Sequence, residues 1–564
     1  LGFGDLSLTV LESDPGVSKF DITLSVEEQD DSIECLIEYR TDLFRRETVE
    51  QMLNEFDLVL DVMTRSIEQP VDNIPWVSEQ NETQLLERYQ SDKTAQLDID
   101  VLSKWKSQVE KNSDRPCVQH GSQQLSFSQI DHWADQLCVK LADTGLKPGD
   151  VVGVYAEPTP LMVTAIVSAL KMGCAFLPLL PDTPRNRRQR MLSTANCKVV
   201  IDCEGNFEQA GIVCLKPATL SSEAPSLAQY PHFSNELPAY IMFTSGSTGE
   251  PKPVVVNRGN LAAFVSAREN FYPDPPKEHL LLQPFNFDVA IGNLFWTLCL
   301  GGCVHLKPRS LTRDPFLLLD AIEREKITHL VLLPLLYEPL LSIATSDQFA
   351  SLTCVILGGE QMPSDLPERH YAVNPNATIY NEYGPTETTV MCAAHPAIDP
   401  SAFGRHPIGN GIGKSHLYIL DEQLNLMPPG ITGELYIGGP QVSNGYLNRP
   451  RETARMFLPD PFSKKAGARV YRSGDLARLR HDGMIELLGR QDDQVKIRGN
   501  RIELGEVVHA IRKLSGVEEA AIKIDRSGTN SRLIAYITLK ESEELSDVDV
   551  IRQLEREIPS YMVP

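Results

Sequence analysis

The sequence predicts an α/β fold, with a large core of parallel-rich sheets layered with helices and a small α+β subdomain after it. Between residues 101 and 487, apolar runs such as VVGVYA (151–156) and THLVLLP (328–334) alternate with helix-like segments such as 161–171. That alternation is typical of parallel sheets covered by helices. After Gly489 the elements become short and charged, as in QVKIRGNRIELGEVVHAIRKL. This change predicts a separate small unit at the C-terminal end.

The residues before the core are expected to form an α+β piece and a linker. Alternating apolar residues in FDITLSV (20–26) and IECLIEY (33–39) predict two strands, and apolar residues recur at helical spacing from Met52 to Met63. Residues 76–98 turn polar, which indicates a linker. The predicted organisation is an N-terminal piece at 1–75, a linker at 76–98, a core at 99–490 and a C-terminal subdomain at 491–564.

Composition excludes several classes of protein. The net charge is −23 and basic residues are dispersed, so a nucleic-acid partner is not expected. No apolar run approaches the roughly 20 residues that span a bilayer, so we expect no membrane partner and a cytoplasmic protein. The eleven cysteines lack CxxC spacing and are expected to be reduced thiols. The sequence opens without Met or a signal peptide, and we expect a fragment of a longer chain.

A loop rich in glycine and hydroxyl residues, TSGSTGEPKP (244–253), follows the strand-like run AYIMF. Glycines allow backbone N–H groups to approach phosphate, hydroxyls donate hydrogen bonds and Lys252 adds a positive charge. We therefore predict a phosphate-binding loop, the alternative being a polar surface loop. It is not a Walker A loop, because Glu250 and Pro251 separate Gly249 from the lysine.

Further motifs follow the same order as in a known family. They are LKMGCAFLPLLPDTP (170–184), NEYGPTETT (381–389), GELYIGGPQVSNGYLN (433–448), YRSGDLARL (471–479) and GRQDDQVKIRGNRIELGEV (489–507). With the loop, they resemble the adenylate-forming superfamily, and in particular the adenylation domains of nonribosomal peptide synthetases. The resemblance covers roughly residues 99–564. It departs from the family at Pro253, where a glycine is usual.

The resemblance implies an ATP-dependent, AMP-forming ligase that uses Mg²⁺. Such enzymes activate an amino acid as aminoacyl-AMP, release pyrophosphate, and load the amino acid as a thioester on the phosphopantetheine of a carrier protein. The implied catalytic residues are Thr244, Ser245, Lys252, Thr386, Glu387, Arg490 and Lys496. The implied nucleotide-binding residues are Gly246, Ser247, Thr248, Gly249, Gly359, Glu360, Asn381, Tyr383, Gly384, Asp475 and Arg490. Glu387 would hold the metal and Asp492 would be the hinge of the C-terminal subdomain.

One lysine of the family lies beyond the given sequence. The family's adenylation lysine follows an LPxYMVP-like run, and the sequence ends inside such a run at Pro564. The resemblance places Lys496 instead near the active site in the thiolation state.

An amino acid is indicated by Asp288 in FNFDVAIGNLFW, which matches the aspartate that holds the substrate's α-ammonium group in amino-acid-activating members. The implied pocket residues are Asp288, Val289, Gly292, Leu332, Ile356, Gly358, Glu382, Val390 and Met391. Gly292 predicts a deep pocket, and Glu382 is the ionisable group among the positions that face the side chain. A basic substrate such as ornithine, lysine or arginine is therefore predicted. The alternatives are an amide or a phenol with Glu382 as acceptor, or an apolar pocket from which Glu382 points away.

The N-terminal piece resembles the last strands and helix of a condensation domain, although the HHxxxDG motif is absent from the sequence. It implies an upstream condensation domain and a downstream peptidyl carrier protein as partners. Two other functions stay open. One is a ligase of the same fold that activates an acyl or aryl carboxylic acid, and the other is a catalytically silent nucleotide-binding scaffold.

Overall fold

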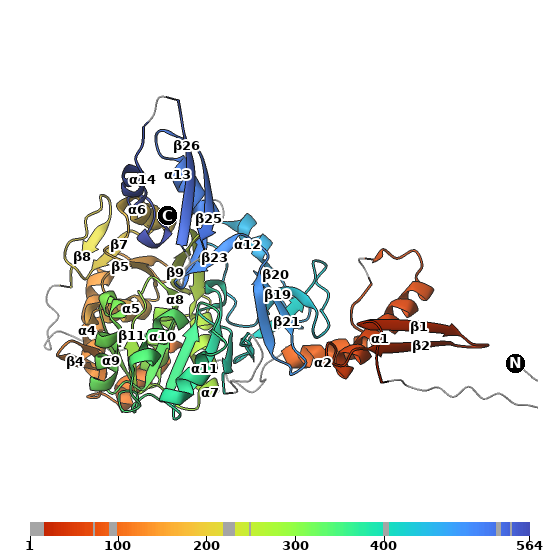
Figure 1. Ribbon diagram of the computed structural model, residues 1–564. Coiled ribbons are helices and arrows are strands. Elements are labelled where there is room, and N and C mark those ends of the chain that lie inside the picture. Colours follow the sequence, from red (N-terminus) through yellow and green to blue (C-terminus); the bar gives the residue numbers. More distant parts are fainter. Residues whose placement is uncertain are drawn as a thin grey trace, which may run out of the picture.

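The computed structural model describes residues 16–71, 74–89, 99–217, 232–246, 250–398, 405–525, 532–541 and 544–564. It confirms the predicted fold class: two parallel-rich sheets and their helices form the main body, and a small α+β unit follows it (Figure 1). Within the described part of the chain, no helix combines the length and the apolar character needed to cross a membrane. All eleven cysteines have free thiols in this structure, and most of them are buried.

The first sheet has six strands in the order β10-β9-β6-β5-β7-β8. Its strands are β5 Val151–Tyr155, β6 Ala175–Leu179, β7 Val199–Asp202, β8 Val213–Leu215, β9 Pro238–Thr244 and β10 Lys252–Asn257. All neighbours are parallel except β9 and β10, which form an antiparallel edge pair. Because β9 and β10 flank the glycine-rich loop, this edge determines where the loop lies.

The second sheet has nine strands in the order β17-β16-β15-β14-β13-β11-β12-β3-β4. Its strands are β3 Pro116–His120, β4 Gln123–Ser126, β11 Glu278–Leu281, β12 Cys303–Leu306, β13 His329–Leu332, β14 Cys354–Gly358, β15 Thr378–Tyr383, β16 Ala393–Pro396 and β17 Asn410–Gly411. The run from β15 to β3 is parallel. Motif residues 381–384 therefore lie at the carboxyl end of β15, where ligands bind in open α/β sheets.

A third, antiparallel sheet is a feature that the sequence analysis did not separate from the core. It consists of β18 His416–Leu420, β19 Thr432–Gly438, β20 Phe457–Pro459, β21 Arg469–Leu479 and β22 Ile485–Arg490. Strands β18 and β19 are buried along almost their whole length, like the strands of the parallel core, whereas β21 alternates between buried and partly buried residues. The sheet carries Asp475 on β21 directly opposite Arg490 on β22.

Helices cover the two parallel-rich sheets. They are α3 Val101–Lys111, α4 Phe127–Ala142, α5 Pro160–Lys171, α6 Arg185–Thr194, α7 Arg258–Phe271, α8 Asp288–Cys299, α9 Pro315–Arg324, α10 Pro334–Ile343 and α11 Leu366–Val373, with 3₁₀ turns η2 Arg309–Arg313 and η3 Thr386–Thr388. Helix α12 Pro450–Met456 packs instead against β20 and β21 of the third sheet. Helix α5 illustrates the local code: the Thr159 side chain accepts from Met162 N and Pro160 occupies the first turn. It is mostly apolar and almost wholly buried, as expected of a core helix, and its buried polar residues Thr164, Ser168 and Lys171 follow one another at helical spacing.

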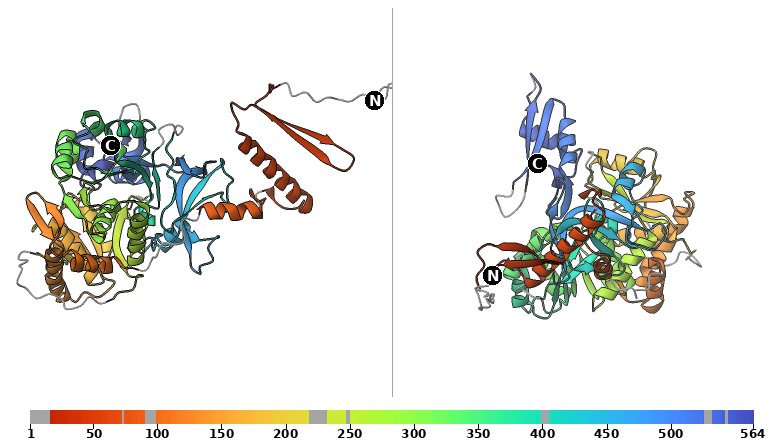
Figure 2. Two further views of the ribbon diagram at one scale, coloured as in Figure 1. Left: turned by 90° about the horizontal axis from the view of Figure 1, so that it is seen from below. Right: turned by 90° about the vertical axis from the view of Figure 1, so that its right-hand side faces the viewer.

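The N-terminal piece projects from the main body (Figures 1 and 2). It contains β1 Ile22–Glu28, β2 Ile33–Tyr39 and α1 Arg46–Arg65, which agree with the predicted strands and helix. Within the predicted linker lies a helix, α2 Glu79–Tyr89, whose Tyr89 ring contacts the Tyr418 ring edge-on at 6.1 Å. The Trp76 indole donates to Asp421 at 3.1 Å. The linker is thus anchored to the third sheet, and the exact domain boundaries stay predictions.

The C-terminal unit lies above the main body in the view of Figure 1. Its elements are β23 Gln494–Ile497, β24 Asn500–Glu503, α13 Leu504–Arg512, β25 Val517–Asp525, β26 Arg532–Leu539, α14 Asp547–Leu554 and the 3₁₀ turn η4 Ser560–Met562. It has an apolar core of its own, which includes Ile502, Val507, Leu554 and Met562. This separate core is what a unit that moves as one body requires.

Lys171 provides a test of the main core. Its side chain is 0% exposed, and its ammonium lies 2.6 Å from Asp131 and 2.8 Å from Asp135. Replacing it with methionine leaves two buried carboxylates without their cation, so Lys171→Met should lower the free energy of unfolding by about 3–5 kcal/mol. Urea denaturation would measure this. Lys104→Met, which removes the partly exposed pair with Glu269, should change little; equal losses in the two variants would contradict the prediction.

Candidate functional site

The glycine-rich loop connects β9 to β10 and faces the C-terminal unit. Ser247, Thr248 and Gly249 lie outside the described residues. At Gly246 a Cβ atom would lie 1.9 Å from the Glu250 carbonyl oxygen, so the loop's path requires glycine there. Pro253 lies in edge strand β10, paired with Phe243 of β9. An edge strand accepts proline, and no positive φ is needed at that position.

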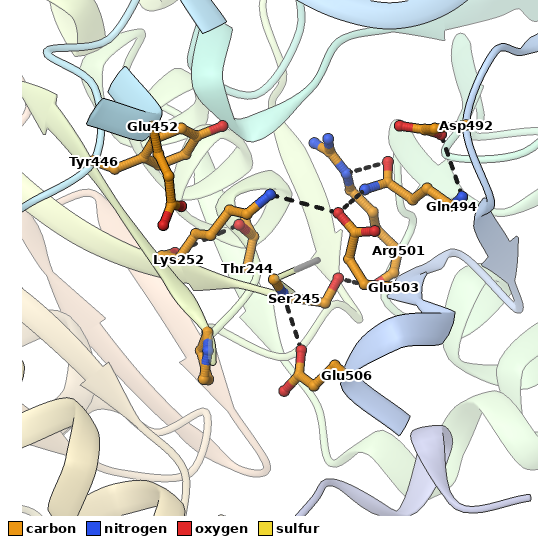
Figure 3. Close-up of polar contacts among 12 residues, drawn as sticks. Thr244, Ser245, Lys252, Tyr446, Glu452, Asp492, Gln494, Arg501, Glu503 and Glu506 are labelled. Atoms are coloured by element: carbon orange, nitrogen blue, oxygen red, sulfur yellow. Dashed lines mark hydrogen bonds and ion pairs between the residues drawn. The ribbon is translucent and has the colours of Figure 1, made fainter. Parts of the chain in front are cut away.

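The predicted phosphate-binding groups of the loop are occupied by residues of the C-terminal unit (Figure 3). Gly246 N donates to Glu506 at 3.0 Å, and the Ser245 hydroxyl donates to the Arg501 carbonyl oxygen at 2.8 Å. Lys252 Nζ lies 3.6 Å from the Glu503 carboxylate. Two carboxylates of the C-terminal unit therefore stand where the loop is suited to hold phosphate.

Glu387, the predicted metal ligand, is buried and is also paired with the C-terminal unit. Arg501 Nη1 lies 2.9 Å from one of its carboxylate oxygens, and the Tyr446 hydroxyl donates to the other at 2.9 Å. Burial alone would raise the pKa of Glu387, but Arg501 and Tyr446 hold it below its ordinary value. The carboxylate is thus ionised and directed at a cation, which is the chemistry a divalent ion such as Mg²⁺ requires.

The third sheet contributes a second charged network. Arg490 Nη1 lies 2.8 Å from Asp475, and its Nε and Nη2 each lie 2.7 Å from Asp492. The other Asp475 oxygen accepts from the Tyr383 hydroxyl. Burial lowers the pKa of Lys496, whose ammonium lies 5.6 Å from the centre of the Tyr383 ring. Asp492 lies between β22 and β23, at the junction where the hinge was predicted.

Most predicted nucleotide-binding residues that the structure describes border one cavity. Its volume is about 570 Å³ and its lining includes Gly359, Glu360, Asn381, Tyr383, Gly384, Asp475, Arg490 and Lys496. Asn381 donates from its amide to the Pro407 carbonyl oxygen at 2.9 Å, and Glu360 accepts from Gly499 N at 2.9 Å. A smaller adjoining cavity of about 160 Å³ is lined by Thr244, Ser245, Asp288, Val289 and Thr386 as well as by Tyr383 and Gly384.

Asp288 is the first residue of α8 and is 7% exposed. Its Oδ2 is buried without a hydrogen-bond partner. Burial raises the pKa of Asp288 to about 6. The Thr386 hydroxyl and the Val289 N–H interact with the same carboxylate and oppose this rise in pKa. The Oδ2 atom, buried at the wall of a cavity without a hydrogen-bond partner among the described residues, is suited to a cationic group supplied by a ligand.

The segment that joins the predicted metal site to the side-chain pocket is strained. Thr389 and Val390 adopt φ values of 58° and 74°, and a β-branched residue such as Val390 rarely enters that region. A Cβ atom on Gly384 would lie 2.2 Å from the Met391 Cα, so the two backbones approach each other closely. Strain of this kind is typical of functional sites.

The side-chain pocket differs from the sequence prediction in depth. Gly292 was expected to leave a deep cavity, but a Cβ atom there would lie 2.8 Å from the Phe264 ring and 3.0 Å from Val390. Phe264 of α7 therefore fills the space. Leu332 packs in the core of the other face of the sheet, whereas Ile356 packs with Tyr272 and Trp296.

Glu382 does not have a free carboxylate. It lies 2.7 Å from Arg268 Nη2 and accepts a hydrogen bond from the Tyr272 hydroxyl. The sequence analysis missed Arg268 and Tyr272. An arginine inside the apolar run NLAAFVSAREN was the available signal, because a buried arginine needs a partner, but nothing in the sequence identified Glu382 as that partner.

Comparison with known families identifies two segments. The pattern of the AMP-binding enzyme family matches residues 105–447, and that of the condensation domain matches residues 2–86. Bacitracin synthase 3 of Bacillus licheniformis is 34% identical over 570 residues, which cover 99% of this chain. Tyrocidine synthase 3 of Brevibacillus parabrevis is 32% identical over 565 residues, which cover 97% of it. The chain spans only 9% and 8% of the lengths of these two proteins.

Solved structures agree with these matches. A four-domain nonribosomal peptide synthetase bound to AMP and glycine superposes with a TM-score of 0.74 at 29% identity, covering 97% of this chain and 41% of that one. A nonribosomal peptide synthetase protein that contains adenylation and PCP domains superposes with a TM-score of 0.73 at 25% identity, covering 83% of this chain and 80% of that one.

The contacts of Glu506 generate a prediction about the C-terminal unit. This buried carboxylate joins Arg187 at 2.8 Å to Gly246 N at 3.0 Å, so it connects the unit to the body. Glu506→Ala should lower the free energy of opening by about 3 kcal/mol and speed amide hydrogen exchange in α13 roughly a hundredfold. Glu519→Ala, which removes an exposed pair within the unit, is the matched control. Unchanged exchange in Glu506→Ala would show that the carboxylate does not hold the unit.

Proposed function

Because this chain belongs to the AMP-binding enzyme family, as the adenylation unit of a nonribosomal peptide synthetase preceded by a condensation-domain segment, we propose that it activates an amino acid with ATP. The substrate carboxylate attacks the α-phosphorus, and aminoacyl-AMP forms as pyrophosphate leaves. A carrier phosphopantetheine thiol then attacks the acyl carbon and displaces AMP. The carrier protein and the upstream condensation domain are the proposed partners. The domain boundaries predicted from the sequence are part of the same proposal.

The observation that carries this proposal is the Asp288 carboxylate. Its unpartnered oxygen borders the same cavity as Thr386 and Ser245, where the α-phosphate would lie. An α-ammonium group bound there would place the substrate carboxylate toward the phosphate groups, and such positioning supplies much of the rate enhancement in reactions of this type. A ligase for acids without an amine would be favoured only if Asp288 faced away from the cavity.

The remaining residues hold the nucleotide. Tyr383 and Asn381 would bind the adenine, and Asp475 would accept from the ribose hydroxyls, as its two carboxylate oxygens allow. Lys252 and the loop amides would neutralise the phosphates. Glu387 fits a Mg²⁺ ligand because it is a buried carboxylate already directed at a cation, and the bound ion would neutralise phosphate charge. The charged residues of these sites do not favour a catalytically silent scaffold.

The side chain of the substrate is proposed to be uncharged. A basic amino acid would need a free Glu382, and this carboxylate is already neutralised by Arg268. The pairing removes the reason for ornithine, lysine or arginine. Because Arg268 and Tyr272 engage both oxygens of Glu382, it also removes the acceptor expected for an amide or a phenol, and of the alternatives it supports an apolar pocket.

The first test is amino-acid-dependent exchange of pyrophosphate into ATP, on protein that includes the lysine motif expected after Pro564. Asp288→Ala should lower the exchange rate by at least about a hundredfold, since truncating one partner of a buried charge pair costs about 3–5 kcal/mol. Asp320→Ala, which changes an exposed aspartate, should retain wild-type exchange. Exchange that occurs only with acids lacking an amine, or not at all, would overturn the proposal.

The pKa of Asp288 gives a second test. With a pKa of about 6, its carboxyl is neutral below that pH and loses the attraction for an ammonium group. Amino-acid affinity should therefore be level above pH 7 and fall about tenfold per unit below pH 6. Calorimetric titration of the amino acid from pH 5 to 8 would measure this. Asp288→Asn should bind weakly with no such slope; a slope in the variant equal to that of wild type would assign the titration to another group.

A further inference from the structure

Arg268 is a fully buried cation at the end of the predicted side-chain pocket. Its side chain is 0% exposed, and its guanidinium lies 4.6 Å from the Trp296 ring centre and 5.0 Å from the Phe264 ring centre. Nη1 donates to Asn293 at 2.7 Å and Nη2 to Glu382 at 2.7 Å. Nε donates to the Met391 sulfur at 3.2 Å. The cation therefore contacts two predicted pocket residues, Glu382 and Met391.

The ion pair is complete on both sides. Arg268 directs three N–H groups at acceptors, and both oxygens of Glu382 are engaged, one by Arg268 and the other by the Tyr272 hydroxyl. Because the two charges of the buried pair cancel, the pair does not attract a charged group of a ligand. It offers neither a free anion to a basic side chain nor a free cation to an acidic one.

The pair lies outside the cavity beside Asp288: Glu382 borders the larger cavity of about 570 Å³, and Arg268 borders a separate cavity of about 480 Å³. The cavity beside Asp288 has a volume of about 160 Å³ and is lined by Val289 and Met242, but Gly292, Ile356 and Glu382 do not line it. Phe264, whose ring lies under the Arg268 guanidinium, occupies the space next to Gly292. Arg268 and Phe264 come from the same helix, so α7 closes the pocket with a charged and an apolar side chain together.

We propose that Arg268 is a specificity-determining residue: its ion pair with Glu382 lies behind Phe264, beyond the end of the amino-acid cavity, and restricts the substrate to a short, uncharged side chain. This inference rests on the proposed function. Either residue, when it loses its partner, would attract a substrate group of opposite charge. Removal of Arg268 leaves a cavity that ends in a carboxylate, and neutralisation of Glu382 leaves a guanidinium without its counter-ion.

The test is the binding of stable aminoacyl-adenylate mimics, the aminoacyl sulfamoyl adenosines, measured by calorimetry on the chain as it is. The set carries alanyl, ornithyl and glutamyl groups. Wild type should bind the alanyl mimic most tightly. Arg268→Ala should bind the ornithyl mimic at least about tenfold more tightly than wild type does, and Glu382→Gln should gain similarly for the glutamyl mimic, since a buried charge favours a partner of opposite sign.

Two variants control for charge and for structure. Arg268→Ala combined with Glu382→Gln has neither charge and should lose both gains. Arg258→Ala removes another buried arginine of α7, paired with Asp100 at 3.1 Å outside the pocket, and should leave the order of preference unchanged. The melting temperature of each variant shows whether it folds. If Arg268→Ala does not fold, the proposal is tested by the binding of the glutamyl mimic to Glu382→Gln. Uniformly weaker binding without a change of preference would overturn the proposal.

The outcomes separate this inference from the proposed function. If wild type binds none of the mimics, and also not AMP, the proposed function fails. If wild type binds the alanyl mimic but Arg268→Ala gains no affinity for the ornithyl mimic and Glu382→Gln gains none for the glutamyl mimic, the proposed function stands. Arg268 then only stabilises the fold. Tightest binding of the ornithyl mimic by wild type would overturn the inference directly.

Discussion

Buried charge needs a partner of opposite sign, and the site depends on this constraint more than on any single contact. Loop amides and Lys252 face Glu506 and Glu503, Glu387 faces Arg501, and Glu382 faces Arg268. The first two sets join the body to the C-terminal unit. Because an unpaired buried charge is costly, these residues bind either one another or a ligand of the same charge pattern. The carboxylates and the arginine of the C-terminal unit thus lie where the predicted site would hold phosphate and a metal ion.

The parallel-rich architecture was predictable because its information is local. Each strand is a short apolar run between turn residues, and each helix, such as α5, has its own capping residues and period. The antiparallel third sheet was not separated, since β18 and β19 are near-continuous buried runs like the strands of a parallel sheet. The helix inside the predicted linker was missed for a related reason: α2 is polar overall, and only Leu85 and Tyr89 are buried against the body.

The site was predictable to the extent that its residues belong to contiguous motifs. Asp475 and Arg490 are fifteen positions apart, yet each lies in a recognisable motif, and the structure pairs them across β21 and β22. The pocket was less predictable because its character depends on a residue outside every motif. The sequence predicts Glu382 as the ionisable group that faces the substrate side chain or as a residue that points away, and only the folded chain brings Arg268, 114 positions earlier, against it. Gly292 likewise indicated depth, although Phe264 fills that space.

The burial of the cysteines bears on the proposed formation of an aminoacyl-adenylate. Cys392 directly follows Met391, a residue of the predicted pocket, and burial raises the pKa of Cys392 to about 12. Cys354, in the cluster around Ile356, has a pKa raised well above its ordinary value by burial. The thiolate is the nucleophilic form of cysteine, so both side chains stay unreactive at neutral pH. A mixed anhydride formed in this site would thus be protected from self-acylation and kept for an incoming thiol of ordinary acidity.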